Sequence, residues 1–143
     1  MSESIYILGA ARTPVGSFQG SLATQSAPEL GAHAMAAALA NGQVKADEVN
    51  EVIIGNVVSS GLKQAPARQA MRIAQLPDSC AATTINKVCG SGMKATMLAM
   101  DLIKAGSADT VVAGGMESMS NAPCLVAKAR AGLRMGHAGM LDS

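Results

Sequence analysis

The chain has 143 residues, with 11 Lys plus Arg against 10 Asp plus Glu, so its formal net charge is +1. A near-neutral chain lacks the positive charge that draws proteins to nucleic acid or acidic membrane surfaces, and no apolar stretch approaches the roughly 18 residues of a membrane span. Hydrophobic residues make up 49% of the chain and charged residues 15%, which excludes a disordered chain. We therefore expect a folded protein with neither nucleic acid nor a membrane as partner.

The predicted elements follow one another as apolar runs separated by capping and turn residues. A buried strand is expected over residues 5–10, and a capping box of Ser26 and Glu29 then starts a helix that reaches about residue 40. Further strands are expected over residues 52–58, 82–86 and 110–113, and further helices over residues 66–76 and 91–105. This β-α-β-α-β-α-β order predicts an α/β fold, with a mainly parallel sheet and helices on both faces.

The last predicted helix indicates a further layer of structure. Within residues 91–105 the charged side chains of Lys94, Asp101 and Lys104 form one narrow stripe, and most other positions are apolar. A helix of this kind is usually buried on most sides, so we expect a covering layer from outside these 143 residues. The periodicity is lost after the last strand. We therefore divide the chain into an α/β domain over residues 1–118 and a truncated segment over residues 119–143.

The three cysteines, Cys80, Cys89 and Cys124, favour a reducing compartment. Their number is odd, no CxxC pair occurs, and a chain of this length can build a core without disulfides. The N-terminal residues show no basic or Arg/Ser-rich leader. We expect free thiols and a cytoplasmic location, and no metal site is predicted.

The residues around Cys89 carry the strongest chemical signal. A strand is expected to end just before Cys89 and a helix to begin just after it, so Cys89 would face the first free N–H groups of that helix. The partial positive charge there favours a thiolate, and the N–H groups of Cys89 and Gly90 are candidate donors to an oxyanion. A cysteine elsewhere is more often a small buried hydrophobic residue. We interpret Cys89 as a nucleophile and Cys80 and Cys124 as structural.

The same residues also fit a dinucleotide-binding pattern. Residues 90–95 match G-x-G-x-x-A between a strand and a helix. That pattern requires an acidic residue at the end of the next strand, but Asp109 precedes the strand and Glu117 comes late. A nucleotide-binding module that uses Gly90-Ser91-Gly92 therefore stays as the alternative function.

Three blocks of this sequence resemble the thiolase family. Residues 86–95, which contain Cys89, are similar to the acyl-enzyme cysteine motif of thiolases. Residues 10–18 are similar to the family's N-terminal signature, and residues 113–120 to a third block. The blocks lie in the family's order across nearly the whole chain, and in detail they most resemble the biosynthetic acetyl-CoA acetyltransferases. The resemblance implies the N-terminal half of a thiolase fold, in which residues 119–143 begin the loop and oligomerisation domain.

The resemblance also implies a chemistry. Cys89 would attack the thioester of acetyl-CoA, release CoA and hold the acetyl group. A second acetyl-CoA would lose a Cα proton and attack that group to give acetoacetyl-CoA, and thiolysis is the reverse reaction. Coenzyme A arrives as part of the substrate, so no tightly bound cofactor is implied. Family members are usually oligomeric, so a homo-oligomer is expected.

The sequence lacks the family's other catalytic groups. Thiolases use a histidine as base and a second cysteine for proton transfer, but His33, His137 and Cys124 do not lie in the family's motifs. Both groups are therefore expected from a C-terminal half, on the same chain or on a separate one. A noncatalytic fragment or subunit, and a ketosynthase acting on carrier-bound acyl chains, remain alternatives. Four basic residues are candidates for phosphate contacts, with loop pinning or a solvated surface as the alternative: Arg12, Lys128, Arg130 and Arg134.

Overall fold

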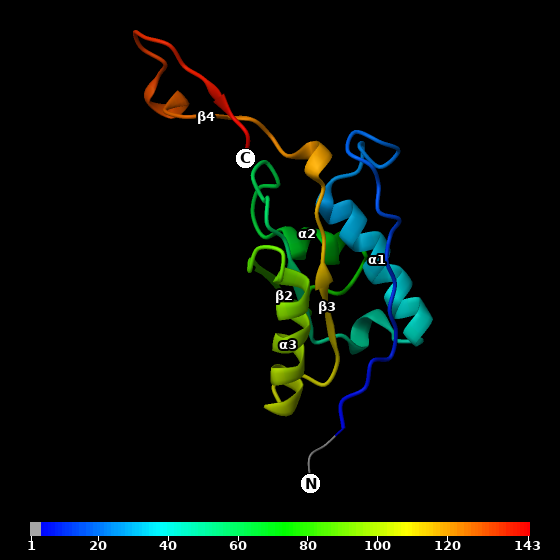
Figure 1. The fold of residues 1–143 in the computed structure, drawn as a ribbon. Helices are drawn as coiled ribbons and strands as arrows, with labels where there is room; N and C mark the ends of the chain where they lie inside the picture. Colours follow the sequence, from blue (N-terminus) through cyan, green and yellow to red (C-terminus); the bar gives the residue numbers. More distant parts are fainter. Residues whose placement is uncertain (1–3) are drawn as a thin grey trace.

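The structure, a computed structural model, describes residues 4–143 (Figure 1). The helices are α1 (Ala27–Gly42), α2 (Pro66–Ile73) and α3 (Ser91–Lys104), and the central strands are β1 (Glu51–Gly55), β2 (Ala81–Ile85) and β3 (Val111–Gly115). A short strand pair, β4 (Leu125–Val126) and β5 (Met140–Leu141), follows near the C-terminus. Single 3-10 turns are formed by Ala46–Glu48, Met119–Asn121 and Ala129–Ala131.

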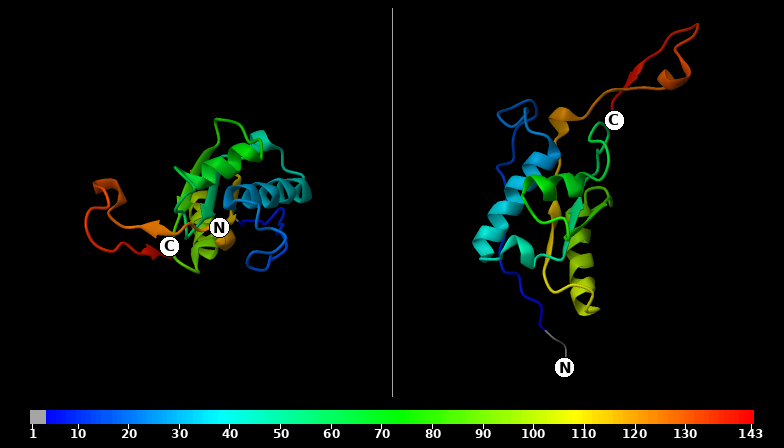
Figure 2. Two further views of the ribbon diagram at one scale, coloured as in Figure 1. Left: turned by 90° about the horizontal axis from the view of Figure 1, so that it is seen from above. Right: turned by 180° about the vertical axis from the view of Figure 1, so that it is seen from behind.

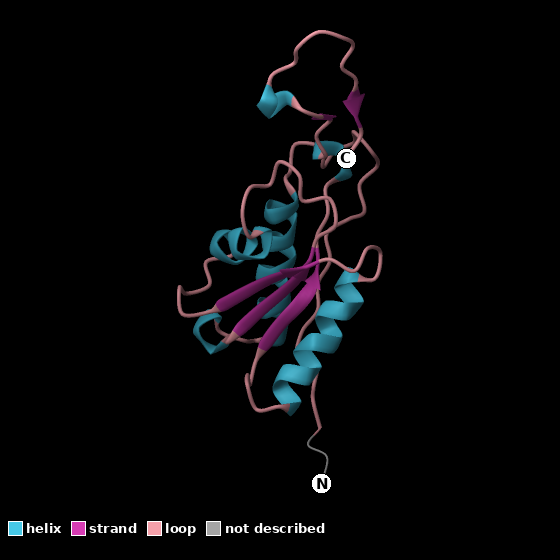
Figure 3. Ribbon diagram, turned by 90° about the vertical axis from the view of Figure 1, so that its left-hand side faces the viewer, coloured by secondary structure: helices cyan, strands magenta, loops and turns pink. Residues whose placement is uncertain are grey.

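The three central strands form a parallel sheet in the order β2-β1-β3. Gly55 at the end of β1 lies opposite Ile85 of β2 and Gly115 of β3, so the carboxyl ends of all three strands meet at one edge. Helices α1 and α2 lie on one face and α3 on the other, as Figure 3 shows. The predicted α/β class, with a parallel sheet and helices on both faces, is confirmed.

The core is built on both faces of β1, the central strand. Val52 and Ile54 point to one face, where they pack with Met71 of α2 and Met35 of α1 in a single buried cluster. Ile53 points to the opposite face because side chains alternate along a strand. On that face the buried residues of α3 are small, which lets the helix approach the sheet closely: Ser91, Ala95 and Ala99.

Helix α1 begins at the predicted capping box. The Ser26 N–H donates to the Glu29 carboxylate over 2.7 Å, and the Ser26 hydroxyl accepts from the Glu29 N–H over 3.4 Å. The helix ends at Gly42, and the next residue, Gln43, has a left-handed backbone with φ of 53°. The prediction placed the start of this helix correctly and its end about two residues early.

The strand predicted over residues 5–10 is wrong. This segment runs extended beside α1, where the backbone of Gly9 meets the backbone of Ala38 and Gly42 so closely that no Cβ fits. The hydrogen bond that Asn41 donates to the Ala10 carbonyl also holds it to the helix. Ile7 is 87% exposed. An apolar run indicates a tendency to be buried, but a strand also needs backbone partners, and within residues 4–143 the sheet supplies none here.

The strand predicted over residues 52–58 ends earlier, at Gly55. Beyond it the N–H groups of Val57 and Val58 donate to the carboxylate of Glu117 instead of to a neighbouring strand. The helix predicted over residues 66–76 likewise ends at Ile73, before the left-handed Gln75. The apolar pattern located both elements, whereas the contacts of Glu117 mark the end of β1 and the left-handed backbone of Gln75 marks the end of α2.

The segment after β3 leaves the α/β body and reaches away from it, as Figures 1 and 2 show. Its first turn is held to the N-terminal loop, because Ser118 and Asn121 both donate to the Gln25 carbonyl over 2.9 Å. The strand pair β4-β5 follows, which the sequence did not predict. The division of the chain at residues 118 and 119 stays a prediction.

One face of α3 is open to solvent. Met93 is 74% exposed and Met97 is 48% exposed, and no element within residues 4–143 covers them. The expected covering layer therefore stays a prediction. No helix among the described residues has the length and apolar character needed to cross a membrane.

Candidate active site

Cys89 lies in the turn between β2 and α3, at the carboxyl edge of the parallel sheet. It is exposed, with a free thiol, whereas Cys80 is buried in the core and donates from its sulfur to the Ala81 carbonyl over 3.4 Å. Burial raises the pKa of the Cys80 thiol, with the nearby Glu51 carboxylate as a smaller cause. Cys124 is exposed in the segment after β3. Cys80 is therefore a small buried residue, whereas Cys89 is not.

The turn that carries Cys89 is closed by backbone and side-chain hydrogen bonds. The N–H of Gly90 donates to the Lys87 carbonyl over 3.1 Å, and the N–H of Ser91 donates to the Val88 carbonyl over 3.0 Å. The Ser91 hydroxyl donates to the same Val88 carbonyl over 2.6 Å and accepts from the Lys87 N–H over 2.8 Å. Val88 has a left-handed backbone with φ of 48°. Cys89 is thus presented by a tight, fixed turn.

Three glycines let the start of α3 sit directly on the ends of two strands. A Cβ added to Gly55 would lie 2.5 Å from the Ser91 Cβ and 2.9 Å from the Gly92 nitrogen. A Cβ on Gly115 would lie 3.5 Å from the Gly92 Cα. The first turn of α3 therefore rests against β1 and β3, and this contact fixes the position of the neighbouring Cys89.

A chain of hydrogen bonds connects the turn to the ends of β1 and β3. Asn86 accepts from the Val88 N–H over 2.9 Å and donates to the Val57 carbonyl over 3.3 Å. The Val57 N–H in turn donates to Glu117 over 2.9 Å, and the buried Asn56 amide donates to the same carboxylate over 2.7 Å. Glu117 therefore has a structural role, because its carboxylate holds the loop after β1 in place through these hydrogen bonds.

The sequence did not predict the roles of Asn86 and Ser91. An asparagine that follows a strand and a serine that begins a helix are both typical of turns in which the side chain bonds the nearby backbone. That signal was present. Its partners depend on the path of the turn, which the sequence pattern does not specify.

The amide groups near Cys89 differ in their availability. The Gly90 N–H is already bonded within the turn, while the Cys89 N–H makes no hydrogen bond among the described residues. Amides at the start of a helix attract negative charge. Of the two candidate oxyanion donors, the geometry therefore favours the Cys89 amide.

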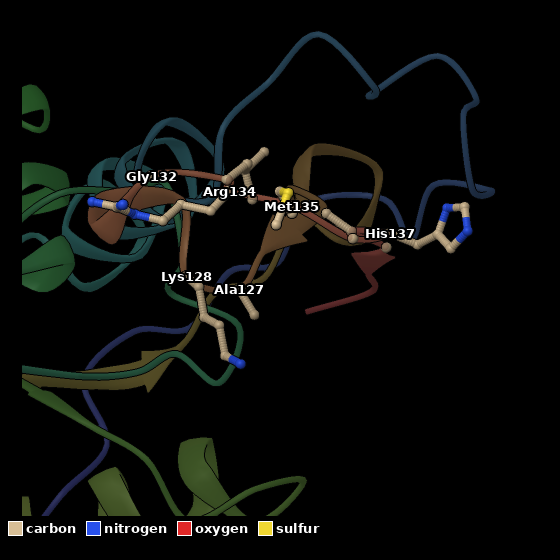
Figure 4. A pocket seen from close by; sticks show the side chains of 10 residues that line it. Ala127, Lys128, Gly132, Arg134, Met135 and His137 are labelled. Carbon is tan, nitrogen blue, oxygen red and sulfur yellow. The ribbon is translucent and has the colours of Figure 1, made fainter.

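The predicted histidines do not join this site. His33 is exposed on α1, and His137 lies beyond β3 in the C-terminal segment. His137 lines a shallow hollow of about 300 Å³ with Lys128 and Arg134, and these three side chains point in different directions (Figure 4). Neither histidine forms a hydrogen bond to residues 86–92 within the described chain.

Within residues 4–143 the Arg12 side chain forms no hydrogen bond to the Cys89 turn. Its guanidinium donates to the carbonyl of the next residue, Thr13, over 3.2 Å, as expected for a side chain that pins its own loop. Lys128, Arg130 and Arg134 are exposed. Among residues 4–143 no group of three or more His, Cys, Asp or Glu side chains is placed to hold a metal ion.

The dinucleotide pattern finds little support in the geometry. Strand β3 ends in Gly115, and the acidic residue with the expected spacing, Asp109, lies before that strand, where its N–H donates to the Asn50 side chain. The Ser91 N–H, which a phosphate would need, donates to the Val88 carbonyl. The G-x-G-x-x-A match is therefore a consequence of the tight cysteine turn.

Comparison with known proteins agrees with the resemblance of the three blocks. The model of the family described as thiolase, N-terminal domain, matches residues 5–143. Acetyl-CoA acetyltransferase 2 of Arabidopsis thaliana is 54% identical over 140 residues, which cover 98% of this chain and 35% of the relative. An acetyl-CoA acetyltransferase of Cupriavidus necator is also 54% identical, over 97% of this chain and 35% of its own.

A solved structure gives the same result for the fold. The crystal structure of a thiolase from Ascaris suum in complex with coenzyme A superposes with a TM-score of 0.92 and 41% sequence identity. The match covers 96% of this chain and 35% of the other. The chain thus spans about 35% of the length of the relatives it matches.

Proposed function

Because this chain belongs to the thiolase family, whose N-terminal domain it matches over residues 5–143, we propose that the whole protein is an acetyl-CoA acetyltransferase. It condenses two molecules of acetyl-CoA into acetoacetyl-CoA and CoA, and it also catalyses the reverse thiolysis. The observation that carries this proposal is the exposed thiol of Cys89 on a fixed turn at the start of α3. Relatives about 50% identical over nearly the whole chain are acetyl-CoA acetyltransferases.

In the first half-reaction the Cys89 thiolate attacks the carbonyl carbon of acetyl-CoA. The carbonyl oxygen becomes an oxyanion and accepts a hydrogen bond from the free N–H of Cys89. When the tetrahedral intermediate collapses, the bond to the CoA sulfur breaks, CoA leaves as a thiolate that takes up a proton, and the acetyl group stays on Cys89. The tight turn supports this covalent step because it holds the Cys89 thiol in a fixed position.

In the second half-reaction a base removes a proton from the methyl carbon of another acetyl-CoA. The resulting carbanion attacks the acetyl carbon on Cys89, the Cys89 thiolate leaves, and acetoacetyl-CoA is released. We propose that the histidine that activates Cys89 and the second cysteine that moves this proton come from the C-terminal half, on the same or a separate chain. The absence of a histidine bonded to the turn within residues 4–143 supports this division.

We further propose that the protein is a homo-oligomer that works in the cytoplasm, without a tightly bound cofactor. The exposed segment around β4-β5 supports the oligomer, since Met135 and Met140 are 102% and 75% exposed there. The three free thiols support a reducing location. The thiolase of Ascaris suum was crystallised with coenzyme A, which supports CoA as the carrier of both substrates.

The test is substitution of Cys89 in the complete protein, with acetoacetyl-CoA thiolysis and acetyl-CoA condensation as assays. Cys89→Ala is expected to abolish both reactions, and Cys124→Ala, which removes another exposed thiol, is expected to keep them. Full activity of Cys89→Ala would contradict the proposal. A nucleotide-binding module would instead retain its ligand after this substitution.

A further inference from the structure

Val88 has a backbone conformation that its side chain disfavours. Among residues 4–143 seven non-glycine residues have positive φ, and Val88 is the one with a β-branched side chain. Branching at Cβ makes the left-handed region especially unfavourable. The residue before the nucleophile is therefore held in place by its surroundings and not by its own preference.

Two side chains hold the Val88 backbone, one at its N–H group and one at its carbonyl. The Asn86 side chain accepts from the Val88 N–H over 2.9 Å, and the Ser91 hydroxyl donates to the Val88 carbonyl over 2.6 Å. Ser91 is only 4% exposed, and its oxygen also accepts from the Lys87 N–H over 2.8 Å. Ser91 thus bonds the backbone on both sides of Val88.

The bond from Ser91 has a consequence for Cys89. The Val88 carbonyl and the Cys89 N–H belong to the same peptide group, which is planar and trans, so they point in opposite directions. A hydroxyl that fixes the direction of the Val88 carbonyl therefore also fixes the direction of the Cys89 N–H. That N–H is the amide that remains free to bind an oxyanion.

We propose that Ser91 is a positioning residue for acyl transfer, which acts through the Val88–Cys89 peptide group to aim the Cys89 amide at the thioester oxygen. This inference rests on the proposed function and goes beyond it by assigning a role to the Ser91 hydroxyl. Ser91 does not touch the substrate. Its effect is specific to reactions that develop negative charge on the carbonyl oxygen.

The experiment compares two reactions of the same thiol in the complete protein. Acetylation of Cys89 by acetyl-CoA passes through an oxyanion, whereas alkylation of Cys89 by iodoacetamide does not. Ser91→Ala is expected to slow acetylation by about 10- to 100-fold, in kcat and not in KM, below the loss for deleting an oxyanion donor. Alkylation of Cys89, followed by peptide mapping, is expected to change less than about 3-fold.

Thr96→Ala is the matched control. Thr96 also lies on α3, is exposed, and donates its hydroxyl to a backbone carbonyl, that of Gly92, over 3.1 Å. Because this bond does not involve the Val88–Cys89 peptide group, both rates are expected to stay unchanged. Cys124 serves as an exposed thiol whose alkylation no variant is expected to affect.

A second variant keeps the inference testable if Ser91→Ala does not fold. Glycine adopts positive φ readily, so Val88→Gly removes the strain of a β-branched residue at positive φ. The turn then depends less on the hydrogen bond from Ser91. In the Val88→Gly background, Ser91→Ala is expected to fold and still to slow acetylation more than alkylation. Where both can be measured, the double variant is expected to acetylate faster than Ser91→Ala alone.

Equal acetylation by Ser91→Ala and the parent protein would overturn the inference and leave the proposed function intact. A parallel fall of acetylation and alkylation would also overturn it, because Ser91 would then only maintain the turn. If the parent protein itself forms no acetyl-Cys89, the proposed function fails and the inference fails with it.

Discussion

Cys80 and Cys89 show how position decides the chemistry of one residue type. Cys80 is 1% exposed in the core cluster, where burial raises the pKa of its thiol and keeps it protonated. Cys89, nine residues later, is exposed on the turn at the start of a helix, where its thiol is open to solvent. The sequence predicted this difference from the glycines and the change of periodicity around Cys89.

The hydrogen bonds that fix the turn could not be predicted in the same way. The two glycines that follow Cys89, Gly90 and Gly92, indicate a close backbone approach, which the contact of Gly92 with Gly115 confirms. The bonds of Asn86 and Ser91 depend on the left-handed turn at Val88, a conformation that the valine itself does not indicate. Local pattern therefore predicted the place of the nucleophile, and the folded turn revealed how it is held.

Met71 is the residue on which the core packing depends most directly. It is fully buried between α2 and the sheet and belongs to the largest buried side chains among the described residues. Met71→Ala is expected to lower the free energy of unfolding by about 2–5 kcal/mol, because the lost contacts leave a cavity. Met119→Ala, at a position 55% exposed, is expected to change it by less than about 0.5 kcal/mol. Chemical denaturation of both variants measures the difference, and equal effects would contradict this packing.

At the scale of elements, the contact of α3 with the sheet depends on Gly55. A methyl group there would lie 2.5 Å from the Ser91 Cβ and 2.7 Å from the Ser91 carbonyl carbon, so the start of α3 would have to move. Gly55→Ala is expected to cost about 1–3 kcal/mol and to slow acylation of Cys89.

Gly114→Ala is the matched control, since the nearest atom to an added Cβ there is a side-chain carbon of Ile54 at 4.0 Å. It is expected to leave the stability unchanged or to raise it by up to about 1 kcal/mol. Thermal denaturation of both variants measures the difference in stability. If Gly55→Ala were as stable and as reactive as Gly114→Ala, the close seating of α3 would be wrong.

The capping box of α1 predicts a pH dependence. Hydrogen bonds from the Ser26 N–H and hydroxyl lower the pKa of Glu29 below its ordinary value of 4.5. A lowered pKa means that the stabilisation is fully present above pH 4.5 and is lost as the pH falls through the value in the folded protein. Glu29→Gln is expected to flatten this part of the stability profile, measured by urea denaturation from pH 6 downward. An unchanged acid slope in the variant would count against the capping box.

Elements with local signals were the ones that the sequence predicted well. Ser26 and Glu29 located the start of α1, and Pro66 the start of α2. The strand expected over residues 5–10 failed because pairing requires a partner that an apolar run does not reveal. The pair β4-β5 was missed because two-residue strands carry no readable period.

At the scale of the whole molecule, the described chain has a packed body and an extended segment after β3. Residues 125–142 are exposed throughout, and three basic residues in this stretch offer sites for trypsin: Lys128, Arg130 and Arg134. Limited trypsinolysis of the 143-residue chain is expected to cleave there before it cleaves at Arg68 or Arg72, which lie on α2. First cleavage within α2 would contradict this division, and mass spectrometry of the early fragments shows which occurs.

For the whole molecule, we propose that the Cys89 site carries an acetyl group between two substrates. The direct measurement is the intact mass of the denatured complete protein after mixing with acetyl-CoA, followed by peptide mapping. We expect one acetyl group, on the peptide that contains Cys89, and its loss on addition of CoA. An acetyl group on Cys124 alone, or none on an otherwise active protein, would show that Cys89 is not the nucleophile.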